Sequence, residues 1–359
     1  MWSFLKKVSA FFLAAFVLLA PWREAPVQTA ASVASSTVSL CKGVRKAPIE
    51  KTGPCTGFAV LSDLHVRSGW FWSPVFRVLL EPAMKDLASA RDRLDAVVFN
   101  GDLTNEGSFA QWDILAEKIG QYSIAKQSFL VTGNHDNWGP NRDEFDNPVN
   151  GVRPTFIKYN RIISGRKIGN MYYAGTVNGN PFIVLGSEDD GTDAYLSPKQ
   201  VKWFARAMEK AAAKGRPIFV FLHQPLNGTH GLPFSFNCEV DADPDDGGVG
   251  DQSARLEKIL KKYDNVFLIT GHIHAGFKNA DARWGAKYAS VEYLKNNRGN
   301  KITLVNSPSY TILDFMRGGL IAMGCGWIVE VHKHEVLLRA RNFMTGQWLT
   351  SYDVAVPLV

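Results

Sequence analysis

The sequence predicts a layered α/β protein, because short apolar runs typical of buried strands recur along the chain with helical stretches between them. The runs are residues 57–61, 96–99, 129–131, 182–185, 218–222 and 266–269. Strands that alternate with helices imply a sheet whose faces are covered by helices.

The clearest helix is expected after Ser197, which can serve as an N-cap ahead of Pro198 at the first helical position. Its amphipathic pattern continues to Gly215, where a helix is expected to end. Near the C-terminus, residues 327–331 and 335–338 predict an antiparallel hairpin. The sequence shows no internal repeat and no second domain boundary.

The composition is that of a globular protein, with 46% hydrophobic and 21% charged residues in a chain of 359. The formal net charge of +6 is compatible with an anionic substrate. No tract rich in Lys and Arg accompanies this charge, so the sequence predicts no specific nucleic-acid partner.

The N-terminus has the pattern of an export signal. Lys6 and Lys7 precede an uninterrupted apolar run over residues 8–20. This run is shorter than the ~20 residues that a membrane-spanning helix needs. A small-residue cleavage pattern at 32–34 lies far from the run, so an uncleaved anchor remains an alternative, as does a buried core helix. We expect residues 1–34 to be a signal peptide or a membrane tether, and the protein to be periplasmic, cell-surface or extracellular.

The remaining chain divides into a linker at 35–56, one domain at 57–345 and a C-terminal tail at 346–359. The four cysteines are Cys41, Cys55, Cys238 and Cys325, which allow three pairings if all are oxidised. Cys41 and Cys55 bracket a short segment that a disulfide can close in an oxidising compartment. No C-x-x-C pair occurs, which argues against thiolate metal binding or redox catalysis.

Two polar segments interrupt the α/β pattern, residues 137–153 and residues 226–252, and both are candidate binding loops or lids. The second carries the acidic residues Glu239, Asp241, Asp243, Asp245, Asp246 and Asp251. A calcium loop is one alternative, but Asp246 stands where an EF-hand needs Gly and Gln252 where it needs Glu. A solvated turn is the favoured interpretation.

Polar side chains able to bind metals follow five of the predicted strands. They are Asp63, His65, Asp102, Asn134, His135, Asp136, His223, His272 and His274. Ligands in open α/β sheets bind beyond the carboxyl ends of the strands, so we expect these groups to meet at one rim. Carboxylates, imidazoles and an amide oxygen suit two divalent cations, which can activate a water for an in-line displacement.

Glycines precede three of these groups, at Gly101, Gly133 and Gly271, and are expected to let the backbone turn sharply and approach the metals closely. His272 and His274 would face opposite ways on a regular strand. They can converge on one site if Gly271 begins an irregular turn.

This ordered set of five blocks resembles the calcineurin-like metallophosphoesterases, over about residues 57–307. The resemblance implies a four-layer αββα sandwich with a dinuclear metal site at the sheet rim. By position, one metal would be held by Asp63, His65, Asp102 and His274, and the other by Asp102, Asn134, His223 and His272. His135 would stabilise and protonate the leaving oxygen, and Asp136 would orient His135. The metals implied are Mn, Fe, Zn or Co.

Departures from the better-known branches narrow the resemblance. Asn105 stands where purple acid phosphatases carry a Tyr, and residues 103–107 lack the Asp-Arg-Gly run of protein phosphatases. The remaining pattern resembles the class III cyclic-nucleotide phosphodiesterase and glycerophosphodiesterase branch. The run from His223 to Leu226 also resembles exported bacterial members.

The function expected from these features is hydrolysis of a phosphodiester outside the cytoplasm. A phosphomonoesterase or diphosphate hydrolase acting on nucleotides or lipid head groups is an alternative. A catalytically inactive, metal-stabilised surface binding protein is another, against which the presence of His135 and Asp136 argues.

Overall fold

The computed structural model describes residues 44–47, 49, 56–139, 146–147, 151–237, 243, 246–277, 288–311 and 323–359. The chain divides into two units, residues 1–42 and 43–359, and the first lies outside the described residues. The predicted export segment therefore lies there too, as do Cys41, Cys55 and Cys238. Cys325 is a buried, free thiol.

The described helices include none with the length and hydropathy needed to cross a bilayer.

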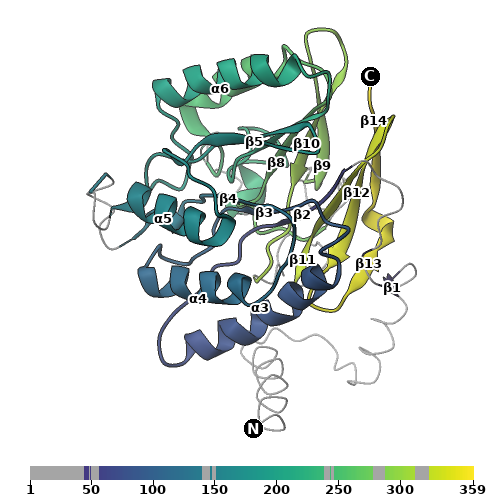
Figure 1. The fold of residues 1–359 in the computed structure, drawn as a ribbon. Coiled ribbons are helices and arrows are strands. Elements are labelled where there is room, and N and C mark those ends of the chain that lie inside the picture. Colours follow the sequence, from purple (N-terminus) through teal and green to yellow (C-terminus); the bar gives the residue numbers. More distant parts are fainter. Residues whose placement is uncertain are drawn as a thin grey trace, which may run out of the picture. The chain divides into compact units, whose positions relative to one another are not determined.

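In the second unit, helices lie between strands from β2 to β8, and the described residues after β8 form strands and one 3₁₀ turn (Figure 1). The strands are β1 (Val44–Lys46), β2 (Thr56–Leu61), β3 (Ala96–Asn100), β4 (Ser128–Val131), β5 (Tyr173–Val177), β6 (Asn180–Val184), β7 (Ile218–Phe221), β8 (Val266–Thr270), β9 (Val291–Lys295), β10 (Lys301–Asn306), β11 (Cys325–Val331), β12 (Glu335–Asn342), β13 (Gln347–Leu349) and β14 (Val354–Pro357). The helices are α3 (Trp72–Ser89), α4 (Phe109–Gly120), α5 (Val152–Ser164), α6 (Pro198–Ala212), α7 (Phe234–Asn237) and α8 (Ser253–Leu260), with short 3₁₀ turns at His135–Asn137, Gly250–Gln252 and Thr350–Tyr352.

Among the described residues the strands form two mixed sheets. In the first, the order is β1-β13-β12-β11-β2-β3-β4, and β14 also pairs with β12. In the second, the order is β5-β6-β7-β8-β10-β9. The strands β2, β3 and β4 run parallel to one another, as do β6, β7, β8 and β10, so each sheet directs several carboxyl ends toward one edge.

Alternation along the strands places a core on each face of each sheet. In β2, Ala59 and Leu61 pack in the cluster that contains α3, α4 and α5, whereas Phe58 and Val60 pack between the sheets. In β7, Phe221 joins the same inter-sheet core, while its neighbours on the other face pack against α6 and α8. Figure 1 shows α3 and α4 on one side of the sheets and α6 on the other. The arrangement is the predicted αββα sandwich.

Each strand run and the helix expected from sequence are present within a few residues of their expected bounds. Ser197 caps α6 as predicted, since its Oγ accepts a hydrogen bond from the Gln200 backbone N–H at 3.2 Å. The predicted C-terminal hairpin is β11 and β12, paired antiparallel with Val331 opposite Val336.

The segments on either side of the predicted domain contain strands that the sequence did not predict. The segment expected to be a tail at 346–359 contains β13 and β14, which both pair with β12. The segment expected to be a linker contains β1, which pairs with β13. Strands of three or four residues are too short to show a clear period in the sequence, which is why the prediction missed them.

Candidate metal centre

The predicted ligands lie on loops that directly follow parallel strands of both sheets. Asp63 and His65 follow β2, and Asp102 follows β3. Asn134 follows β4, His223 follows β7, and His272 and His274 follow β8. These side chains form two groups with the geometry of metal sites, and Asp102 belongs to both.

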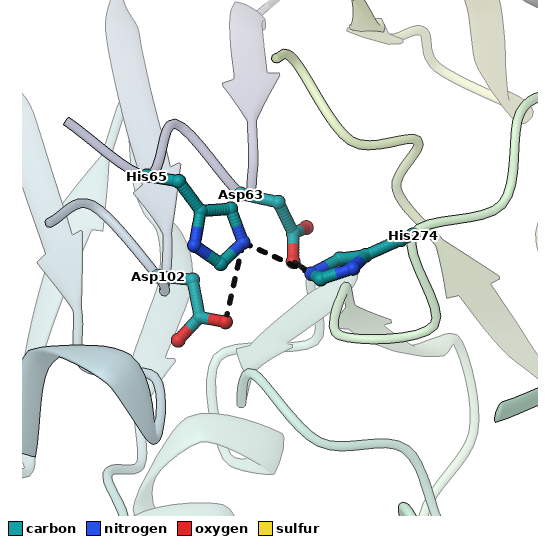
Figure 2. A group of neighbouring side chains, drawn as sticks. All are labelled: Asp63, His65, Asp102 and His274. Atoms are coloured by element: carbon teal, nitrogen blue, oxygen red, sulfur yellow. Dashed lines mark hydrogen bonds and ion pairs between the residues drawn. The ribbon is translucent and has the colours of Figure 1, made fainter. Parts of the chain in front are cut away.

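The first group, here called the outer cluster, consists of Asp63, His65, Asp102 and His274, whose side chains point toward one another (Figure 2). The Nε2 atoms of His65 and His274 lie 3.0 Å apart. Nε2 of His274 is 3.2 Å from Oδ1 of Asp63, and Nε2 of His65 is 3.6 Å from Oδ2 of Asp102. The His274 side chain is 22% exposed, so this cluster reaches the surface.

The second group, here called the inner cluster, contains Asp102, His223 and His272, with Asn134 buried at the end of the neighbouring strand. Nε2 of His223 is 3.1 Å from Oδ2 of Asp102. The rings of His223 and His272 have centroids 5.1 Å apart. All four residues are no more than 2% exposed, so the protein shields this cluster from solvent.

Several polar atoms of the two clusters are buried without a hydrogen-bond partner within the described part of the chain. They are Oδ2 of Asp63, Oδ1 of Asn134, and Nδ1 and Nε2 of His272. Oδ2 of Asp102 and Nε2 of His223 belong to the same set except for their ion pair with each other at 3.1 Å. A buried polar group left without a partner costs about 1–3 kcal/mol. Divalent cations would satisfy these lone pairs, and the mixture of carboxylate, imidazole and amide donors suits such cations. The residues therefore fit a pair of metal ions.

The backbone at the ligands is held in a conformation that non-glycine residues rarely adopt. Positive φ angles occur at Asp63 (56°), His65 (43°), Asp102 (49°), His272 (70°) and His274 (56°). Hydrogen bonds between loops hold this geometry, as Asp63 N–H donates to the Gly101 carbonyl at 3.0 Å and His65 N–H to the Asp102 carbonyl at 2.8 Å. Strained backbone of this kind concentrates at functional sites.

The expected role of the glycines is borne out by the packing around them. A Cβ on Gly101 would collide with the His223 ring, and a Cβ on Gly133 would collide with the Asp102 carboxylate. After β8 the chain makes a tight turn in which Ile273 N–H donates to the Gly271 carbonyl at 2.8 Å. This irregular turn, centred on His272, lets His272 and His274 converge on one site.

Electrostatics differ between the two clusters. Burial opposes the charge of Asp102, yet the His223 imidazole outweighs it and holds the pKa of Asp102 well below its usual value. Burial also lowers the pKa of His223, but attraction to Asp102 and Asp63 outweighs this and raises it to about 9. Burial, the main cause, lowers the pKa of His65 to about 3 and that of His272 well below its usual value.

His135 lies beside the outer cluster, and its orientation corrects one prediction. Its ring centroid is 4.5 Å from that of His65, and its Nδ1 donates to the Asn105 carbonyl at 2.9 Å. Asp136 does not contact this imidazole. Its carboxylate instead accepts hydrogen bonds from the backbone N–H groups of Leu103, Thr104 and Gly133 and from the Thr104 hydroxyl. Asp136 thus holds the loops together, while Asn105 orients His135.

Sequence reasoning missed this role of Asn105 because it is performed by a backbone carbonyl, which leaves no signature in residue identity. The same holds for Asn100, whose carbonyl lies 2.9 Å from Nδ1 of His223. A carbonyl that accepts from one ring nitrogen fixes the orientation of the imidazole. In the predicted ligand His223 this leaves Nε2 to face the metal site.

Two loops border the centre. Phe236, in the polar segment 226–252, stacks on His272 with ring centroids 4.6 Å apart, so the described part of this segment covers the inner cluster. A second loop, residues 187–193, was not singled out from the sequence. It lies beside the His135 loop, because the Trp138 indole N–H donates to the Asp190 carbonyl at 2.9 Å. Of the six acidic residues in the polar segment 226–252, Glu239, Asp241 and Asp245 lie outside the described residues.

A protein-family model for the calcineurin-like phosphoesterases matches residues 57–276, which include all seven predicted metal ligands. The match spans more than half of the chain, and the chain therefore belongs to this family. Among curated protein sequences, none matches the chain significantly.

Solved structures agree on the fold. A dimetal phosphatase from Danio rerio is similar with a TM-score of 0.53 and 12% identity, over 85% of this chain and 100% of that one. A purple acid phosphatase from seeds of yellow lupin (Lupinus luteus) is similar with a TM-score of 0.54 and 12% identity, over 84% of this chain and 53% of that one. Family and fold define the protein as a metal-dependent phosphoric ester hydrolase, as the sequence predicted.

Proposed function

We propose that the protein is an exported phosphodiesterase with two divalent cations, one in the outer and one in the inner cluster. The observation that carries this proposal is the shared carboxylate of Asp102, which belongs to both groups and whose buried Oδ2 lies 3.1 Å from Nε2 of His223 and 3.6 Å from Nε2 of His65. When bound, two such cations supply an activated water and charge stabilisation for an in-line displacement at phosphorus.

His135 is proposed as the general acid. A carbonyl can only accept, so the contact between Nδ1 and the Asn105 carbonyl keeps a proton on Nδ1. The proton available for transfer is then the one on Nε2 of the imidazolium, and the Asn105 carbonyl stabilises that cation. The transfer neutralises the leaving oxygen as its bond to phosphorus breaks.

We infer a preference for diesters from the acidic residues in the two loops that border the centre. The loop 187–193 contains Glu188, Asp189, Asp190 and Asp193. It is tied to the polar segment 226–252, since Gly247 N–H donates to Asp193 Oδ1 at 2.8 Å. Near neutral pH a diester carries one negative charge and a monoester close to two. Acidic walls therefore penalise the monoester more.

Export is proposed from the sequence alone, from Lys6, Lys7 and the apolar run at 8–20. Cyclic nucleotides are scarce outside the cytoplasm, so an extracytoplasmic diester is the favoured substrate class.

The test is kcat/KM of the metal-loaded protein for matched substrates, bis(4-nitrophenyl) phosphate and 4-nitrophenyl phosphate. The diester is expected to be the better substrate. A better monoester would favour a phosphomonoesterase, and no hydrolysis of either would favour an inactive binding protein.

A further inference from the structure

The segment from Arg67 to Trp72 presents an unusually exposed aromatic surface. Trp70 is 92% exposed and Trp72 is 41% exposed. Tryptophan is enriched at binding interfaces because its indole offers a large apolar face together with a polar N–H. From residue 64 to residue 80 the sequence contains no Asp or Glu, in contrast to the acidic loops on the rim.

A chain of contacts connects this segment to the metal centre. The Arg67 guanidinium carbon lies 5.3 Å from the centroid of the Trp72 ring. Nε of Arg67 donates to Oδ1 of Asn105 at 3.0 Å, and the carbonyl of the same Asn105 accepts from His135. The aromatic surface therefore begins next to the group proposed to protonate the leaving oxygen.

The charge of Arg67 is available for an anion. Within the described residues Arg67 contacts a neutral amide and an indole ring, and no carboxylate. Arg77, the next arginine along the chain, is instead held by Glu117, with Nη2 2.7 Å from Oε2. Arginine suits phosphate recognition because its planar guanidinium donates several hydrogen bonds at once.

We propose that Arg67, Trp70 and Trp72 form a subsite for a phosphodiester that carries an aromatic substituent. Arg67 contacts the phosphate charge, and the indoles of Trp70 and Trp72 stack on the ring of the substituent that is not the leaving group. This proposal rests on the proposed function and narrows its substrate class to aryl-bearing diesters.

The experiment uses two diesters with the same leaving group, phenyl 4-nitrophenyl phosphate and methyl 4-nitrophenyl phosphate, and the full-length, metal-loaded protein. The parent is expected to prefer the phenyl ester in kcat/KM. In the double variant Trp70→Ser, Trp72→Ser, this preference should fall about tenfold, since stacking on an aromatic side chain contributes about 1–3 kcal/mol per base. Arg67→Gln should raise KM for both esters and leave their ratio unchanged.

Tyr293→Ser is the matched control. Tyr293 is likewise 41% exposed and has a cation over its ring, with Nζ of Lys301 4.4 Å from the centroid, but it lies on β9 at the edge of the second sheet. The control should keep the parent's preference for the phenyl ester.

An unchanged ester ratio in the double Trp variant would overturn the subsite. If that variant also lost co-sedimentation with phosphatidylcholine vesicles, the aromatic surface would be a membrane-docking surface instead. Failure of the parent to hydrolyse either diester would overturn the proposed function and the subsite with it. If the parent hydrolyses the diesters and the double Trp variant keeps the same ratio of kcat/KM for the phenyl and methyl esters, only the subsite is overturned.

Discussion

The outer and inner clusters share Asp102 but differ in their access to solvent. The outer cluster includes His274, with a side chain 22% exposed, and its imidazoles lie within contact distance of one another. The inner cluster is buried and is covered by Phe236, which stacks on His272. From this difference we expect the inner cluster to hold a cation more tightly than the outer cluster, which is open to solvent.

The two clusters also differ in charge before any cation is bound. In the outer cluster the pKa of His65 is lowered to about 3, so this imidazole is neutral at physiological pH. In the inner cluster the pKa of His223 is raised to about 9, so this imidazole carries a proton. A cation must displace that proton, because a metal-binding imidazole is neutral.

The largest effect is expected at the carboxylate that joins the clusters. Asp102→Ala should lose most of both metals and lower activity by roughly 10³-fold or more, since a bound cation contributes several kcal/mol to the transition state. Elemental analysis after desalting measures the metal content. The control is His334→Ala, at an exposed histidine on the β11–β12 turn. Two metals retained without Asp102 would contradict the shared-ligand assignment.

A His135 variant tests whether proton transfer to the leaving oxygen takes place beside the outer cluster. His135→Asn should leave metal content unchanged and lower turnover of alkyl esters by ~10²–10⁴-fold, because their leaving oxygens need a proton. Nitrophenyl esters leave as stable anions and should be affected far less. Equal losses on both kinds of ester would show that His135 acts by positioning alone.

Chelation should separate the two clusters in order of exposure. Titration with a chelator is expected to remove one metal before the other, and His274→Ala should lose the metal that leaves first. His272→Ala should lose the other metal. Metal content and activity are measured together during the titration. Loss of both metals in a single step would contradict the difference between the clusters.

The pH dependence of metal binding should also distinguish the clusters. Affinity at the inner cluster is expected to rise about tenfold per pH unit from pH 7 to 9, as competition with the His223 proton weakens, and to level off above its pKa. The outer cluster should show no such rise in this range. Competition with a chelator of known affinity measures both, and a flat inner affinity would contradict the raised pKa.

The smallest effect is expected in the polar segment 226–252, which contains Phe236. Changing Asp241, Asp243, Asp245 and Asp246 to Asn should raise kcat/KM for the monoester relative to the diester, because it removes repulsion that acts more strongly on the more highly charged monoester. The increase should be only several-fold, because solvent screens surface charges. The same measurement at high salt should erase the difference. An unchanged ratio would mean that the segment does not select between the substrates.

The sequence by itself determined the fold class and the residues of the centre. Apolar strands of four to six residues must be buried on both faces, and polar groups placed at their ends must then gather at one rim. The need for glycine at positions 101 and 133 could also be predicted from sequence, because a sharp turn directly before a metal ligand leaves little space for a side chain. These features depend on neighbours in the chain, so residue order is sufficient to predict them.

Only the tertiary structure decided which groups touch. The Asn105 carbonyl orients His135 and Asp136 holds the loops, although the family resemblance implied that Asp136 would orient His135. The sequence likewise could not show that, among the described residues, Arg67 contacts no carboxylate while Arg77 pairs with Glu117, or that Trp70 is exposed. Backbone carbonyls look alike at every position, and exposure depends on what packs from distant parts of the chain. These properties arise only when both sheets are assembled.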